Sequence, residues 1–157
     1  MSRSGAKAWV LGLLLAACGY APVRRGQSGL RVGAVRNATA QAEAGGIFAS
    51  ELRSELSGRG RLEPDASSAP EVQAELLALT SFPTAAGSEG AAAFRLEARL
   101  RVRAPNYDDL VVASEDYLAG VDVLGTEANR RAALRRVART VAREAVERMD
   151  VQERFAR

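Results

Sequence analysis

The sequence predicts an α+β domain in two layers, with two helices packed on one face of a four-stranded sheet in the order β-α-β-β-β-α. Residues 94–103 alternate apolar and charged side chains, which is the pattern of a half-buried strand. Residues 46–57 and a long segment after residue 125 repeat apolar side chains with the period of a helix. Neither helix can bury its apolar stripe alone, so we expect both on the same face of the sheet.

The first strand is predicted over residues 30–35, because alternate residues there are apolar. Asn37 and Thr39 then indicate a turn that leads into the first helix. That helix covers residues 46–57 and ends at the glycines that follow it. Its apolar stripe is formed by Ile47, Phe48, Leu52 and Leu56.

The remaining strands follow from prolines and from alternation. A loop is expected over residues 59–70, and a second strand over residues 71–82, which two prolines bracket. Residues 84–90 indicate a flexible hairpin connection to the third strand, residues 94–103. A turn over residues 104–106 leads to a fourth strand over residues 110–118.

The last helix has the strongest periodic pattern in the chain. We expect it to open at Gly125 and Thr126, with Thr126 as the N-cap and Glu127 placing negative charge in the first turn. Apolar residues then recur with helical spacing for about four turns. They are Leu134, Val137, Ala138, Val141, Ala142, Ala145, Val146 and Met149.

The N-terminus has the pattern of a secretory signal peptide. Arg3 and Lys7 precede an apolar run of about ten residues, and the small residues Ala16 and Ala17 follow it. A helix that spans a bilayer needs about 20 apolar residues. The sequence therefore predicts a cleaved signal peptide over residues 1–17.

Cys18 is the only cysteine, and the stretch Leu15-Ala16-Ala17-Cys18 resembles the lipobox of bacterial lipoproteins. In that family the thiol and the new amino group are acylated, and two or more acyl chains give stable anchoring. We expect lipid attachment at Cys18, a lipidated tether over residues 18–29 and a domain over residues 30–157. A buried free cysteine is the alternative. Gly19, in place of the aspartate that favours inner-membrane retention, indicates the outer membrane, with the domain on its periplasmic side.

The composition excludes several functional classes. The chain has no histidine, and acylation of Cys18 leaves no free thiol, so catalysis by a serine–histidine or cysteine–histidine pair is excluded. No phosphate-binding glycine loop or cluster of metal ligands is present in the sequence, so we expect no enzyme activity, no cofactor and no metal. The mature chain would have 20 basic against 19 acidic residues, which argues against nucleic acid as a partner.

Three stretches of the chain resemble the LptE family, whose members are lipopolysaccharide-assembly lipoproteins of the outer membrane. They are the mature start Cys18-Gly19-Tyr20, the strand-to-helix passage over residues 30–56 with Asn37 and Thr39, and residues 115–134, EDYLAGVDVLGTEANRRAAL. The last stretch is similar to the deltaproteobacterial members.

The resemblance implies a role without catalysis. LptE proteins occupy the lumen of the β-barrel LptD as a plug, and the pair receives lipopolysaccharide from a periplasmic bridge and places it in the outer leaflet. The implied partners are therefore an LptD-type barrel and lipopolysaccharide. The alternative is an accessory lipoprotein subunit of another envelope lipid-export system, which would have the same anchor and no such barrel.

One face of the third strand offers candidate contacts. Arg95, Arg99, Arg101 and Arg103 share one side, and guanidinium groups bind phosphates through two parallel hydrogen bonds. The phosphates of lipid A and acidic groups on the barrel wall are both possible targets, and an ordinary solvated strand face is the alternative. Tyr117 is a further candidate contact, because tyrosine suits a partly hydrated interface.

Overall fold

The computed structural model describes residues 29–65, 67–87 and 90–155. The signal peptide predicted at residues 1–17, Cys18 and nearly all of the tether predicted at residues 18–29 lie outside the described residues. These three expectations stay predictions.

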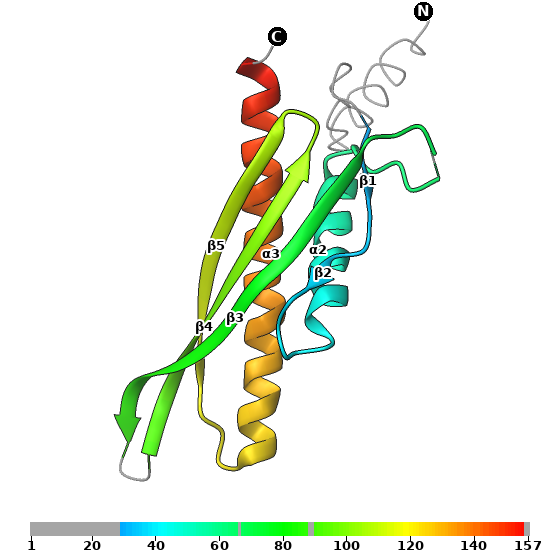
Figure 1. Ribbon diagram of the computed structural model, residues 1–157. Coiled ribbons are helices and arrows are strands. Elements are labelled where there is room, and N and C mark those ends of the chain that lie inside the picture. The colour runs from blue at the N-terminus through cyan, green and yellow to red at the C-terminus, as the bar shows by residue number, and fades with distance from the viewer. Residues whose placement is uncertain (1–28, 66, 88–89, 156–157) are drawn as a thin grey trace, which may run out of the picture.

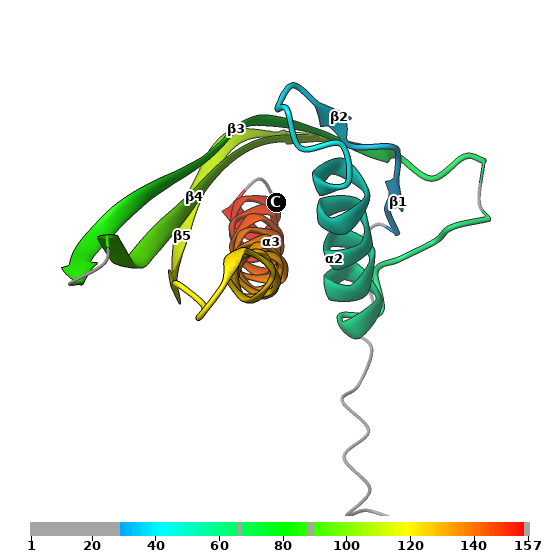
Figure 2. The same ribbon diagram turned by 90° about the horizontal axis from the view of Figure 1, so that it is seen from below.

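A curved mixed sheet and two helices form two layers. The sheet contains β1 (Arg31–Val32), β2 (Arg36–Asn37), β3 (Glu71–Gly87), β4 (Gly90–Ala104) and β5 (Tyr107–Leu118). β3, β4 and β5 form an antiparallel meander, and β1 and β2 both pair with β3 in parallel. The helices α2 (Ala44–Gly58) and α3 (Val123–Phe155) lie together on the concave face of the sheet (Figure 1, Figure 2). The predicted fold class and element order are confirmed.

Of the first predicted strand, residues 30–35, only Arg31–Val32 form a strand, β1, and β2 follows the predicted range at Arg36–Asn37. Arg31 pairs with Glu71 and Arg36 pairs with Glu75, so β1 and β2 have one residue more than β3 between these two pairs. An extra residue on one strand interrupts the ladder as a bulge does. The sheet therefore has five strands in four positions, in place of the four expected.

The core lies between the helices and the sheet, as the periodicity predicts. Every apolar residue predicted for the stripe of α3 is 2% exposed or less. Phe48, Leu52 and Leu56 of α2 are fully buried, and so are Leu96 and Leu100 of β4. At about 25 cal/mol per Å² of apolar surface, this burial is the main force that holds the two layers together.

The strands are longer than the sequence indicates. β3 continues through Pro83 to Gly87 and β4 begins at Gly90, so the predicted hairpin between them is confirmed, while its connection is shorter than the predicted residues 84–90. Among the described residues, no strand pairs with β3 on its other side beyond Leu76, so Pro83 at this edge needs no donor there. β5 begins directly after a tight turn in which Asn106 has a φ of 60°.

α3 begins earlier than expected, at Val123, and its 33 residues make roughly nine turns. Asp122 is its cap, because its carboxylate accepts a hydrogen bond from the N–H of Gly125 at 2.6 Å. The hydroxyl of Thr126 instead accepts from the N–H of Gly120 and donates to the carbonyl of Asp122, both at 2.9 Å. The prediction of Thr126 as N-cap is therefore wrong, and the first turn contains no acidic residue.

Candidate functional site

The four predicted arginines lie together on the outer face of β4. Their neighbours Leu96, Ala98, Leu100 and Val102 are fully buried under the helices, so the intervening residues face away from them. We call Arg95, Arg99, Arg101 and Arg103 the arginine face. Their side chains are between 45% and 55% exposed.

Carboxylates of β5 neutralise three of these arginines. Arg95 donates two hydrogen bonds to Asp116, at 2.7 and 3.0 Å, and Arg101 donates two to Asp108, at 2.8 and 2.9 Å. Arg103 also reaches Asp108, at 3.3 Å. The hydrogen bond from Arg95 lowers the pKa of Asp116, and that from Arg101 lowers the pKa of Asp108, below the ordinary range. The face is therefore a set of cross-strand ion pairs.

The fourth arginine is paired as well, since Arg99 donates to Glu97 on its own strand at 3.0 Å. A phosphate that binds here must compete with these carboxylates. Exposed ion pairs are typically worth less than about 1 kcal/mol each, so such competition is feasible. Without a ligand, the arginine face matches the alternative of an ordinary solvated strand face. Its guanidinium groups are exposed enough for a ligand to contact them.

A polar hollow adjoins the arginine face. It has a volume of about 360 Å³, and its lining includes Arg101, Arg103 and, from β2, Arg36. Glu71 and Glu75 line it too, and Glu75 is 3.4 Å from the guanidinium of Arg36. The hollow is therefore suited to a polar headgroup that carries both charge and hydroxyl groups.

Tyr117 does not belong to this surface. It lies on the helix-facing side of β5 and is 7% exposed. Its ring stacks on Phe94 with a centroid separation of 5.2 Å, and its hydroxyl is 2.6 Å from the hydroxyl of Ser81. Tyr117 thus acts as a core residue in this structure, apart from the four arginines.

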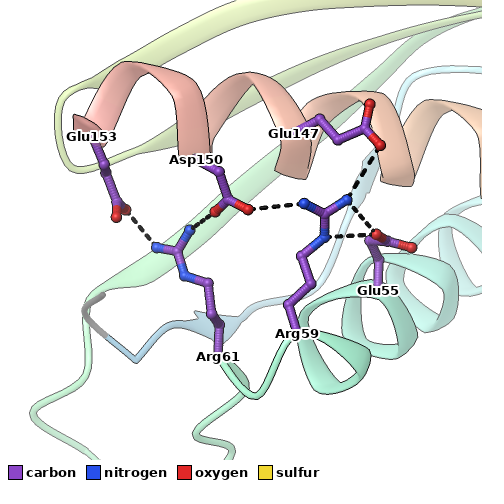
Figure 3. Close-up of polar contacts among 6 residues, drawn as sticks. All are labelled: Glu55, Arg59, Arg61, Glu147, Asp150 and Glu153. Atoms are coloured by element: carbon purple, nitrogen blue, oxygen red, sulfur yellow. Dashed lines mark hydrogen bonds and ion pairs between the residues drawn. The ribbon is translucent and has the colours of Figure 1, made fainter. Parts of the chain in front are cut away.

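A buried group of charges joins α2 to α3, and no pattern in the sequence predicted it. α2 ends in a Schellman motif, in which Gly60 has a φ of 65° and the N–H of Arg61 donates to the carbonyl of Leu56 at 2.8 Å. This turn directs the side chains of Arg59 and Arg61 towards the last turns of α3 (Figure 3).

We call this group the charged clamp. It consists of Glu55, Arg59, Arg61, Glu147, Asp150 and Glu153. Asp150 accepts from both arginines, with 2.8 Å to Arg59, and Arg61 also binds Glu153. Arg61 is 2% exposed and Asp150 is 6% exposed, so both charges are withdrawn from water. Losing one partner of such a buried pair is strongly destabilising.

The connection between β5 and α3 has the opposite character. Four large aliphatic residues are widely exposed in it and at the adjoining ends of the two elements: Leu118 at 67%, Val121 at 106%, Val123 at 83% and Leu124 at 80%. We call these four residues the apolar loop. The sequence indicated this stretch only through its family resemblance, because short apolar runs next to a helix usually extend its buried face.

Two further observations concern membrane-spanning helices and metal ligands in the described part of the chain. Within it, no helix is long and apolar enough to cross a membrane. No group of three or more His, Cys, Asp or Glu side chains in these residues could hold a metal ion.

The chain is similar to one protein family and to several solved structures. Residues 28–149 match the family model LptE, described as lipopolysaccharide-assembly. The rare lipoprotein B of Shewanella oneidensis has a similar structure, with a TM-score of 0.57 and 12% identity over 80% of this chain and 98% of that one. A hypothetical protein of Chlamydia trachomatis is also similar, with a TM-score of 0.53 and 15% identity over 80% and 98%. No curated protein matches the sequence. At these identities the two structures support the fold alone.

Proposed function

The chain belongs to the LptE family of lipopolysaccharide-assembly proteins, and we propose that it is the lipoprotein plug of an LptD-type β-barrel that inserts lipopolysaccharide into the outer leaflet. The observation that carries the proposal is the extent of the family match, which spans residues 28–149 and so includes every strand, α2 and all but the last turns of α3. The chain binds and positions its partners in this role and catalyses no reaction.

The proposed location is the periplasmic side of the outer membrane, with the domain held by acyl chains on Cys18. Replacing the cysteine tests the anchor directly. Cys18→Ala should abolish labelling by radioactive palmitate and leave an uncleaved or soluble chain. Normal labelling of this variant would contradict the proposal.

The partnership is tested by affinity purification of the full chain from detergent-solubilised outer membrane. We expect an LptD-type barrel to remain bound through the washes. Recovery of subunits of a different envelope lipid-export complex, without such a barrel, would favour the alternative function.

The arginine face is the proposed contact with lipopolysaccharide phosphates. The support for this contact is that four exposed guanidinium groups share one face of β4 beside a polar hollow. This face carries more basic side chains than an average strand does. Arg99→Ala with Arg101→Ala should weaken lipopolysaccharide binding, and binding by the parent should fall as salt rises.

The matched control is Arg135→Ala with Arg143→Ala, which removes the same charge from exposed positions of α3. If the parent and the variant with both Arg99 and Arg101 replaced bind lipopolysaccharide equally well at low salt, the arginine face serves only to form ion pairs within the domain.

A further inference from the structure

The apolar loop lies at one end of the domain, beside the end of the β3–β4 hairpin (Figure 1). Leu118 pairs with Ala93 of β4, and the N–H of Ala119 donates to the carbonyl of Ala92 at 3.0 Å. The loop therefore continues the sheet, and its aliphatic side chains extend beyond the last layer of the core.

This loop is held in one conformation. The hydrogen bonds among Gly120, Asp122, Gly125 and Thr126 close it, and Asn129 of α3 donates to the carbonyl of Leu118 at 3.0 Å. A Cβ at Gly120 would lie 2.5 Å from the backbone of Gly125, so only glycine fits this close approach. Exposed aliphatic side chains on a preorganised loop lose little conformational entropy on binding, as a docking surface requires.

The composition of the loop favours a protein over a bilayer as its occupant. Membrane surfaces are usually bound by Trp or Tyr together with Lys or Arg, and residues 118–126 contain none of these. The described chain also begins at the other end of α3, where the N–H of Leu30 donates to the carbonyl of Arg61 at 2.7 Å. That point is about 40 Å along α3 from the loop. An anchor at Cys18 would thus be joined to the domain at the clamp end, away from the loop.

The area of the loop favours a large partner over a second copy of this chain. Its four residues offer on the order of 500 Å² of surface, while each side of a stable interface buries about 800 Å². β4 lies between β5 and β3, so the edge of β3 that is free beyond Leu76 in the described part of the chain is on the opposite side of the hairpin from the loop and does not extend this surface. A partner that surrounds this end of the domain would bury the loop as one part of a larger interface, as a barrel around a plug does.

We infer that the apolar loop docks into a recess lined by aliphatic side chains on the partner barrel, an inference that rests on the proposed function. The side chains of Val121 and Leu124 fill this recess as anchors.

The test is purification of the full chain with the LptD-type barrel of the same organism. The variant is Val121→Ser with Leu124→Ser, which leaves the hydrogen-bonded residues of the loop in place. Loss of two anchor residues should reduce the barrel recovered about tenfold. The control is Phe155→Ser at the opposite end of α3, where an 87% exposed side chain is also made polar; it should retain the parent's recovery. Unchanged circular dichroism and melting temperature of the purified variants show that they are folded.

Failure of the parent to retain the barrel would remove the proposed function itself. Retention by the parent and equal retention by the double variant would overturn the inference alone. Two further measurements identify other occupants. If the purified parent sediments as a dimer and the double variant sediments as a monomer, the loop would be assigned to contact with a second copy of the chain. Binding of the parent to phosphatidylethanolamine and phosphatidylglycerol vesicles, lost in the double variant, would assign it to lipid.

Discussion

The two ends of α3 differ in which side chains they bury and which they expose to water. At its C-terminal end α2 lies alongside, and the charged clamp buries Arg61 and Asp150 away from water (Figure 3). At its N-terminal end α3 extends beyond α2, and only strands and the apolar loop accompany it (Figure 1). Charges are buried at one end and aliphatic side chains are exposed at the other.

The difference shows which end the chain completes by itself. At the clamp end each buried charge has its counter-ion within the same domain, so nothing further is needed to stabilise it. At the loop end apolar surface stays in water, where it contributes nothing to the stability of the isolated domain. Substitutions should therefore affect folding at the clamp end and partner binding at the loop end.

The largest effect is expected from Asp150→Ala, which removes the carboxylate that Arg59 and Arg61 share. Because Arg61 stays buried with part of its compensation lost, the free energy of unfolding should fall by about 3 kcal/mol. Urea denaturation measures it. Glu147→Ala is the control, because this side chain is 56% exposed and 3.4 Å from Arg59, and it should cost less than about 1 kcal/mol. Equal costs for the two variants would show that burial of the clamp does not matter.

The next effect tests how the clamp is positioned. Gly60→Ala places a Cβ on a residue with a φ of 65° and should cost about 1–2 kcal/mol. Gly58→Ala is the matched control, since nothing lies within 4 Å of a Cβ there and the residue is helical; it should be neutral or stabilising. Thermal melts compare the two. A neutral Gly60 variant would mean that the Schellman turn does not constrain the arginines.

At the loop end the cap of α3 should have a smaller and more local effect. Asp122→Ala removes the acceptor for the N–H of Gly125 and should cost about 1 kcal/mol. Amide hydrogen exchange should accelerate at residues 120–126 and stay unchanged at the clamp. Faster exchange in both regions would contradict the separation of the two ends.

The smallest effect is expected at the tip of the loop. Val121 is fully exposed, so Val121→Ser should change the free energy of unfolding by less than about 0.5 kcal/mol. Chemical denaturation of the purified domain measures this. A loss comparable to that of Asp150→Ala would mean that the loop supports the fold and would weaken its assignment as a docking surface.

The sequence was a good guide where one face of an element is apolar. The alternation of β4 and the stripe of α3 predicted the core, because helix and strand periods place those residues on one side. It was a poor guide to boundaries, since the break between β1 and β2 depends on register with β3, which local propensity does not specify.

The candidate site was predictable only in part. The positions of the four arginines follow from the strand period, while their carboxylate partners on β5 depend on the register of the hairpin. Arg61 lies in a polar stretch between a helix and a proline, which is typical of an exposed loop, and nothing near it in sequence indicates burial. The apolar loop was missed for the reverse reason, since apolar residues are expected to be inside.

The clamp also affects when, during synthesis, α2 can pack stably against α3. Arg61 and Asp150 are 89 positions apart. A polypeptide that emerges N-terminus first from a ribosome or a translocation channel presents the arginine long before its counter-ion. Until the last turns of α3 are present, docking of α2 buries the guanidinium of Arg61 without Asp150 and Glu153, which weakens the docking. A fragment that stops short of Asp150 should therefore be cleaved by proteases faster than the finished chain.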